Sequence, residues 1–437
     1  MGSRPTLHKL CYNGCSFRTR LHPFLSAEPR CFMLKSIKLT NLLSFGPNSE
    51  PLELGPLNVL IGANGSGKSN LIEAISLLQA APRNLTKPIV EGGGLREWLW
   101  KGAEGTPVAT IEVGIEYPDR AHVNEAGKLL RYKLSFTDVQ QQIEVVDEHL
   151  VENSTGNGQH QLVPYFTHKG TDININLSEN ISMQPSESNG SYARESALSL
   201  YKGPTFESPS ISVFLAPTIN FASQQLDAIR IYRNWRFAPN EDPRRLLPVE
   251  AQGDFLNEDA SNLIAVLNIL LKNNKVKKQL IRYLNDFYRF AENIRVSPFR
   301  HYLELRVKDG DFFTPAARLS EGTLRWLALL TILLHPTPPP LVCIEEPENN
   351  LHHDVIPTLA ELLRNASERT QLIITTHSTA LVDEFSDTPE VVVVCDKEKL
   401  NGSTRMRRLD REDLKEWLKD EGLGLIWASG EIGGNRW

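Results

Sequence analysis

The sequence predicts an α/β fold with a parallel sheet at its centre, and three observations support this. A glycine-rich loop, GANGSGKS at 62–69, follows the apolar run LNVLI and precedes a helical pattern. Apolar runs at 341–345, 371–376 and 390–395 alternate with helical stretches, which is typical of strands buried on both faces. The 437 residues are enough for one large, elaborated domain.

The composition is that of a globular protein without a strong overall field. The net charge of −6 means that any contact with nucleic acid would have to be a local patch. The longest apolar run, at 324–334, is too short to span a bilayer, so we interpret it as a buried helix and expect no membrane contact. The five cysteines lack zinc-site spacing, which favours reduced thiols and a cytoplasmic protein.

Residues 1–32 have neither helical nor strand periodicity. They are basic and almost free of acidic residues, which superficially resembles a transit peptide. Because a strand pattern begins directly after Met33, we predict a poorly structured N-terminal extension followed by a domain over 33–437.

We expect three lobes within that domain. The first, 33–151, is a nucleotide-binding lobe whose later strands alternate like half-buried antiparallel strands. The second, 152–315, is an inserted region of irregular loops and then, over 258–293, two helices that sustain no coiled-coil heptads. The third, 316–437, carries the later parallel strands. The strands expected in the first lobe lie at 34–40, 57–61, 108–117, 128–136 and 141–151.

The loop at 62–69 matches the phosphate-binding pattern G-x-x-x-x-G-K-[ST] at every position. Its backbone N–H groups can surround a phosphate, and the following helix directs its positive end towards that phosphate. Lys68 is expected to reach the β- and γ-phosphates and Ser69 to hold Mg²⁺. The predicted ATP-binding residues are Asn64, Gly65, Ser66, Gly67, Lys68 and Ser69.

An acidic pair follows the strand at 341–345 in the stretch LVCIEEPE. In phosphate-loop enzymes the first acid holds the magnesium shell and the second can polarise the attacking water. These would be Glu345, as a magnesium ligand, and Glu346, as the catalytic base. An acidic pair after a strand can also be a solvated loop, but Pro347 favours a fixed exit from the sheet.

Two further stretches are less specific when taken alone. ITTHS places His377 at the carboxyl end of the next strand, the edge where ligands bind in open parallel sheets, although a lone histidine is more often structural. RLSEGTLR places Ser320 directly before a helix, where it can serve simply as an N-cap. Twenty residues ahead of an acidic-pair strand, Ser320, Glu321 and Gly322 are also candidates for a phosphate contact.

The order of these motifs resembles the ABC-type ATPases of the RecF, SMC and OLD group. The resemblance rests on a Walker A loop, an LSxG signature, an EEPE Walker B segment, a D-loop-like ENNLH and a switch histidine. The start IKLTNLLSF and the tail WLKDEGLGLIWASGEIGGNRW resemble the stand-alone "predicted ATPase" branch of AAA type. The likeness covers 33–110 and 315–437. It implies an ABC-type ATPase head with a mixed or antiparallel N-terminal sheet, a central parallel sheet and an inserted helical lobe.

The departures from the family pattern are specific. Glu321 stands where transporter signatures carry Gly, Glu345 stands in place of the usual Asp, and no Q-loop glutamine can be placed. There are no heptads for an SMC-like arm and no acidic nuclease module of the complete OLD type.

The resemblance also implies a mechanism. Two copies would bind ATP and Mg²⁺ between Lys68 of one and Ser320 of the other. Glu346 would activate water, and His377 would sense the γ-phosphate. ATP would close this homodimer, or a higher oligomer, and hydrolysis would open it.

DNA is the substrate that the resemblance suggests, in repair, genome maintenance or phage defence. The stretch RIYRNWRF interleaves basic and aromatic residues, and KNNKVKKQLIR adds lysines. Such patches can equally be solvated or structural. Two alternatives remain: a regulatory ATPase that controls a protein effector such as a nuclease, and a P-loop kinase or other transferase, which would not need a signature. The candidate DNA contacts are Arg230, Arg233, Arg236, Lys277 and Lys278.

Overall fold

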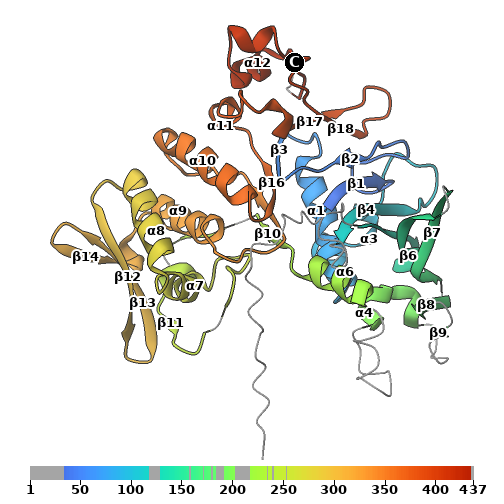
Figure 1. The fold of residues 1–437 in the computed structure, drawn as a ribbon, viewed down its shortest axis with the longest axis horizontal. Coiled ribbons are helices and arrows are strands. Elements are labelled where there is room, and N and C mark those ends of the chain that lie inside the picture. The colour runs from blue at the N-terminus through green and yellow to red at the C-terminus, as the bar shows by residue number, and fades with distance from the viewer. Residues whose placement is uncertain are drawn as a thin grey trace, which may run out of the picture. The chain divides into compact units, whose positions relative to one another are not determined.

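A six-stranded sheet lies at the centre of the fold in this computed structural model (Figure 1). Its strand order is β10-β15-β16-β3-β17-β18, and neighbouring strands are parallel except for the edge strand β18. The bounds are β10 Arg230–Tyr232, β15 Leu341–Glu345, β16 Gln371–Thr375, β3 Leu57–Ile61, β17 Val392–Lys397 and β18 Thr404–Arg408. The structure describes residues 34–117, 128–156, 159–170, 172–178, 181–183, 191–201, 217–233, 235–238, 241–251 and 253–434. The predicted extension over 1–32 lies outside them.

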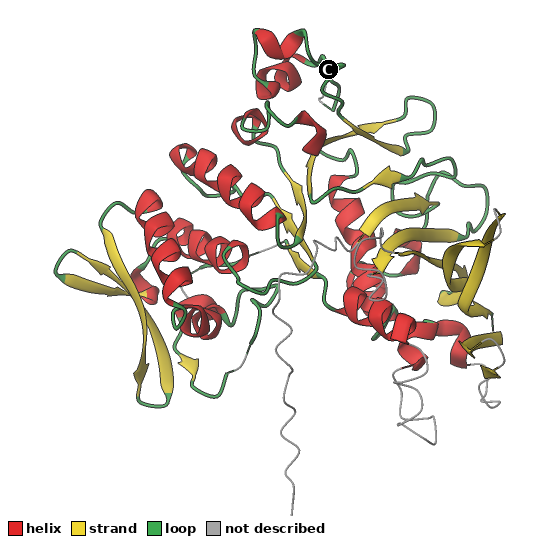
Figure 2. Cartoon of the chain, viewed as in Figure 1, coloured by secondary structure: helices red, strands yellow, loops and turns green. Residues whose placement is uncertain are grey.

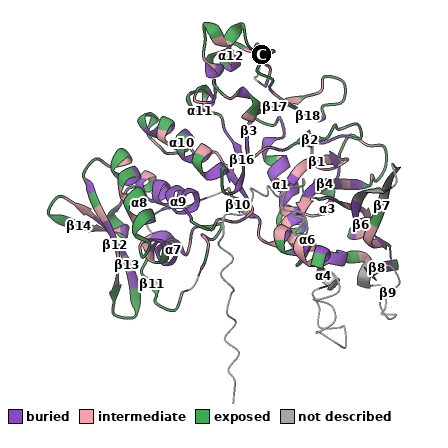
Figure 3. Ribbon diagram, in the orientation of Figure 1, coloured by how far each residue is buried: buried purple, intermediate pink, exposed green. Residues whose placement is uncertain are grey.

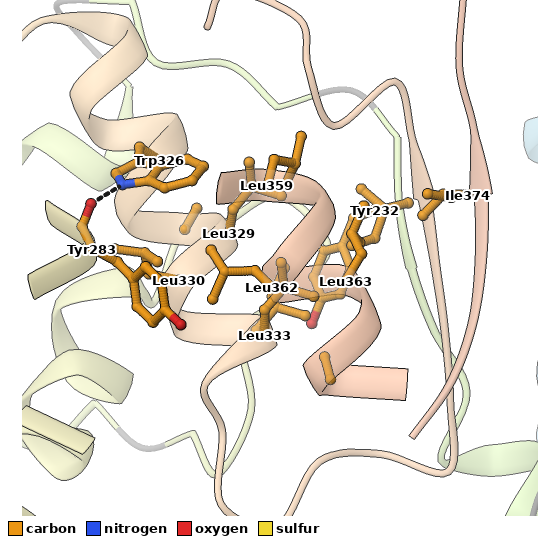
Figure 4. Packing of buried hydrophobic residues seen from close by; sticks show 14 of the residues in the cluster. Tyr232, Tyr283, Trp326, Leu329, Leu330, Leu333, Leu359, Leu362, Leu363 and Ile374 are labelled. Carbon is orange, nitrogen blue, oxygen red and sulfur yellow. Dashed lines mark hydrogen bonds between the residues drawn. The ribbon is translucent and has the colours of Figure 1, made fainter. Parts of the chain in front are cut away.

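The two faces of this sheet pack into different hydrophobic cores. Val59, Ile344 and Ile374 point to one face and pack with the helices α9 and α10, as Figure 4 shows for Ile374. Leu60 and Ile373 point to the opposite face and pack with α1. Alternate residues of a strand point to opposite faces, so α1 and α9 lie on opposite sides of the sheet. The bounds are α1 Lys68–Ala80, α9 Glu321–Leu333 and α10 Ile356–Ser367.

Helix α9 is almost completely buried, as predicted from its apolar run (Figure 3). Leu329, Leu330 and Leu333 pack against Leu362 and its neighbours on α10. Trp326, also on α9, donates its indole N–H to the carbonyl of Tyr283 at 2.9 Å. A helix that is apolar all round requires this kind of burial.

A second, eight-stranded sheet is antiparallel throughout (Figure 2). After 152, where irregular loops between strand pieces were expected, the strands are more continuous, since β7 and β8 extend the meander next to β6. The bounds are β2 Leu52–Glu53, β1 Leu34–Thr40, β4 Ala109–Tyr117, β5 Lys128–Val139, β6 Gln142–Gly156, β7 Gln159–Lys169, β8 Asp172–Ser178 and β9 Ile181–Met183. Helices near this sheet are α2 Thr86–Glu91, α3 Leu95–Trp98, α4 Ala197–Tyr201 and α6 Pro217–Asp227.

The remaining lobe combines two helices with a small antiparallel sheet. The expectation of helix to residue 293 is wrong, since Ala291 begins a strand that pairs with residues 302–309. The signal for this sheet was the alternation of Leu303, Leu305 and Val307, which are buried, with polar neighbours. The bounds are α7 Leu263–Leu270, α8 Asn274–Phe287, β11 Leu247–Pro248, β12 Ala291–Phe299, β13 Tyr302–Asp309 and β14 Phe312–Pro315, while α11 Thr379–Asp383 and α12 Leu423–Ser429 lie towards the C-terminus.

Within the described part of the chain, no helix has the length and apolar character needed to cross a membrane.

Candidate active site

The loop after β3 has the backbone that phosphate binding requires. Gly65 has a φ of 77° and Gly67 a φ of 107°, a region that residues with a Cβ rarely adopt. A Cβ on Gly67 would lie 2.2 Å from the Thr404 hydroxyl, whereas one on Gly65 would have nothing within 4 Å. The buried Ser66 hydroxyl has no hydrogen-bond partner among the described residues. The loop is therefore tightly held on one side and open at Gly65.

Lys68 begins helix α1 and is 5% exposed. Its ammonium donates to the carbonyls of Gly62 at 2.7 Å and Ala63 at 3.1 Å, so the charge is held over the loop. Burial lowers the pKa of Lys68, and the nearby charges of Glu346 and Glu345 partly oppose this. The Lys68 ammonium is therefore close enough to Glu345 and Glu346 for their charges to affect its pKa.

Glu345 ends β15 and is largely buried. Burial raises its pKa, Glu346 raises it further, and a hydrogen bond with the Ser69 side chain lowers it. Its Oε1 is buried and has no hydrogen-bond partner among the described residues. A hydroxyl beside a carboxylate with a free oxygen is an oxygen donor set that suits Mg²⁺.

Glu346 has a left-handed backbone, with a φ of 46°. Its N–H donates to the Thr375 carbonyl at 3.0 Å, and its own carbonyl accepts from Arg325 at 2.9 Å. These bonds from β16 and α9 hold a conformation that is uncommon for a residue with a Cβ. Its Oε1 lies 3.6 Å from Nε2 of His377, so the two sequence-predicted catalytic residues face each other.

His377 follows β16, and its backbone N–H donates to Oε1 of Glu348 at 3.2 Å. Burial lowers the pKa of His377, and the Lys68 charge lowers it further. The imidazole is therefore neutral over a wider pH range than an exposed histidine. Glu348 also accepts from the Thr376 hydroxyl, a supporting role that the motif EEPE contained but that sequence reasoning did not assign.

Arg325 is a second residue that sequence reasoning missed. It is 6% exposed, its guanidinium carbon lies 5.2 Å from the centre of the Trp235 ring, and it bonds to the Glu346 carbonyl. Its signal was only its place in LSEGTLR, one turn after Ser320.

Ser320 is an N-cap. Its hydroxyl accepts from the Thr323 N–H at 3.0 Å and lies 2.7 Å from the Thr323 hydroxyl. Glu321 opens the first turn, and a Cβ on Gly322 would lie 2.9 Å from the Asn350 carbonyl. The hydrogen bonds that the structure describes for the Ser320 side chain stay within its own cap, and α9 packs on the face of the sheet opposite to α1.

The candidate DNA contacts fall into different environments. Tyr232, Trp235 and Phe237 are 2%, 8% and 1% exposed, so the structural alternative holds for these three side chains, and they are not placed to stack on bases. They belong to the core between the sheet and the helices. Arg233 lies beside Glu345, and Arg230 donates to the Asp227 and Ile229 carbonyls. Arg236 and Lys278 are exposed, and Lys277 is half-buried.

Comparison with known proteins supports the same assignment of fold and chemistry. Residues 57–383 match the family described as "AAA domain, putative AbiEii toxin, Type IV TA system". A curated "ATP/GTP phosphatase" of Helicobacter pylori (strain ATCC 700392 / 26695) is 21% identical over 365 residues, which is 80% of this chain and 87% of the relative.

Among solved structures, an Smc head bound to the C-winged helix domain of ScpA is similar, with a TM-score of 0.51 and 14% identity. The match covers 87% of this chain and 99% of that one. At this identity the likeness shows the fold alone, which is that of an ABC-type ATPase head, as predicted.

Proposed function

The chain belongs to this family of AAA-domain ATPases, and on that premise we propose that it hydrolyses ATP in a composite site formed by two copies. The observation that carries the proposal is the separation of the motifs. Lys68, Glu346 and His377 gather at the carboxyl edge of the sheet, while the Ser320 side chain bonds within its own cap, at the start of a helix on the face opposite to α1. A second copy, placed head to tail, would supply the missing Ser320.

Residues of the loop bind and orient the nucleotide in this proposal. The N–H groups of 64–69 and the N-terminal end of α1 point to the β-phosphate, and Lys68 moves from the loop carbonyls to the phosphate oxygens. Ser69 and Glu345 would hold Mg²⁺, which supplies positive charge to the transferring phosphoryl group.

Glu346 is the general base and His377 its partner. The Glu346 carboxylate accepts a proton from the attacking water, and His377, 3.6 Å away, orients that carboxylate and meets the γ-phosphate. A neutral imidazole has a single N–H, which would pass from the Glu346 carboxylate to a γ-phosphate oxygen when the nucleotide binds. Asn349 and Arg325 hold Glu346 through its side chain and its backbone.

Ser320, Glu321 and Gly322 act in trans. The hydroxyl of Ser320 and the free N–H groups of the first turn of α9 would contact the γ-phosphate bound by the partner copy. Closure would then require ATP, and loss of the γ-phosphate would open the pair.

We propose DNA as the target of this ATP-driven closure, in repair, genome maintenance or phage defence. The exposed Arg236 and Lys278 and the half-buried Lys277 support contacts with phosphates. A protein effector such as a nuclease is the second candidate, favoured by exposed aromatic side chains at the small sheet: Phe290, in the turn before β12, is 69% exposed, and Phe312, on β14, is 78% exposed.

ATP hydrolysis with and without duplex DNA at low salt separates these candidates. Stimulation by DNA that falls in the double variant Lys277→Gln, Lys278→Gln supports direct action on DNA. An unchanged rate at every DNA concentration contradicts it. If a co-purified partner protein stimulates ATP hydrolysis, and the double variant Phe290→Ser, Phe312→Ser loses that stimulation, the result would instead support a protein effector.

A further inference from the structure

Arg233 stands at the end of a row of strand ends. β10 is parallel to β15, with Tyr232 opposite Ile344, so the next residues, Arg233 and Glu345, are neighbours. Across the sheet, β10, β15, β16 and β3 are followed in turn by Arg233, the acidic pair, His377 and the phosphate loop. Ligands of open parallel sheets bind at this edge. Arg233 therefore shares the edge with every group of the proposed site in its own chain.

The guanidinium of Arg233 is only partly used. Its Nε lies 3.7 Å from Oε1 of Glu345, which is beyond hydrogen-bond distance. Buried Nε and Nη2 have no hydrogen-bond partner in the part of the chain that the structure describes. Buried donors on a charged group are nearly always bonded, so these two point to a ligand with acceptor oxygens.

Space for such a ligand exists beside the arginine. Arg233 lines a cavity of about 720 Å³ that also reaches Glu73 on α1 and Glu258. The charge of Glu73 raises the pKa of Glu345, so the cavity lies next to Glu345 at the edge of the proposed phosphate site.

We propose that Arg233 binds the terminal phosphate of the nucleoside triphosphate held by its own chain, a deepening that rests on the proposed ATP site. Two parallel N–H groups of a guanidinium match two phosphate oxygens. With the triphosphate bound, the arginine exchanges a long contact with Glu345 for bonds to the γ-phosphate, and Glu345 is released towards the metal.

Two simpler roles compete with this one. An outward DNA contact requires an accessible head group, but the two unpaired nitrogens are buried. A purely structural ion pair would neutralise Glu345 without touching nucleotide. The structural ion pair and the proposed phosphate contact differ in how they depend on the γ-phosphate and on the metal. Nucleotide-binding measurements test both dependences.

The experiment measures the affinity of Arg233→Gln and of the wild-type protein for a non-hydrolysable ATP analogue and for ADP. Each affinity is measured with magnesium and with EDTA. We expect Arg233→Gln to weaken the analogue roughly ten- to a hundredfold in both conditions, the value of one or two charge-assisted hydrogen bonds. Binding of ADP should be unchanged. Arg289→Gln removes an exposed arginine from the helical lobe and should bind both nucleotides as wild type does.

Three results would overturn the assignment. They are equal weakening of the analogue and ADP, an effect that disappears in EDTA because it acts only through Glu345, and no effect at all. Arg233→Lys, which keeps the charge but loses the fork, should fall between the parent and the Gln variant, and thermal unfolding verifies that both fold. If the wild-type protein binds neither nucleotide, the proposed ATP site itself is wrong. If the wild-type protein binds both nucleotides and Lys68→Ala binds neither, the ATP site stands, and the result for Arg233→Gln decides the inference about Arg233 alone.

Discussion

The phosphate loop and the signature helix begin in similar ways and end in different surroundings. α1 starts at Lys68 and α9 follows Ser320, so each presents the free N–H groups of a helix start. Around Lys68 the fold brings Glu345, Glu346 and His377 from neighbouring strands. Around Ser320 the described contacts are those of its cap with Thr323, and the Asn350 carbonyl lies near Gly322.

In the proposed composite site, these two helix starts are the two halves, and they belong to helices on opposite faces of one sheet. A complete half lies at the carboxyl edge beside α1, and an unfinished half lies at the start of α9. Arg325 links them within a chain, because it sits on the signature helix and bonds to the Glu346 backbone. In the proposed dimer, docking of the signature would therefore act on Glu346, the proposed general base, through one side chain.

The largest expected effect removes the complete half. Lys68→Ala should weaken ATP binding roughly a hundredfold or more, because a buried ammonium makes charge-assisted bonds to two phosphates. Calorimetric titration with ATP measures the loss. Lys101→Ala, which removes an exposed lysine paired with Glu97, is the matched control and should bind ATP normally. Normal binding by Lys68→Ala would contradict the account of the loop.

The next prediction breaks the second half without unfolding its helix. Ser320→Asp keeps an N-cap of equal quality but places a negative charge at the γ-phosphate of a partner copy. ATP binding should persist while hydrolysis falls to background, and Ser320→Asn, an uncharged cap, should lose less. Full activity of Ser320→Asp would reduce LSEGTLR to a helix cap.

Mixing two inactive variants tests whether the site is shared between two chains. A dimer of Lys68→Ala with Ser320→Asp contains one intact composite site, so an equal mixture should recover about a quarter of the parent rate by random pairing. Steady-state phosphate release measures it. No recovery, in a mixture shown to exchange subunits, would place both halves in one chain.

A smaller effect concerns pH. The pKa of Glu345 is raised by burial and by Glu346, and magnesium needs its charged form. Magnesium-dependent ATP binding should therefore weaken as the pH falls through that raised pKa. Glu346→Gln should move this acid limb to lower pH because it removes the neighbouring charge. The limb should remain in His377→Asn, since burial lowers the pKa of His377. An acid limb that vanished with His377 would contradict the assignment to Glu345.

The sequence was sufficient for the central strands and for the cluster around Lys68. The strands at 57–61 and 341–345 have the predicted bounds, because each is an apolar run between turns. Because these strands are parallel, their carboxyl ends had to meet at one edge. Residues that directly follow them could therefore be assigned without coordinates.

The environment of Arg233 could not be predicted in the same way. β10 has only three residues, too short for its alternation to show which side chains point inward. RIYRNWRF therefore left a DNA contact and a structural cluster open, and Tyr232 and Trp235 are core residues. The sheet at 291–315 was missed because it follows directly on a strongly periodic helix, whose pattern was extended too far.

The central claim is tested most directly by the mass of Glu346→Gln in solution, by light scattering with and without Mg-ATP. This variant should bind ATP but turn over roughly a hundred- to ten-thousandfold more slowly, the usual contribution of a general base, and so hold the closed state. We predict a monomer without nucleotide and a dimer with Mg-ATP, and a monomer in both conditions when Ser320→Asp is added. A mass that ignores ATP, or a dimer that forms despite Ser320→Asp, would contradict the composite site.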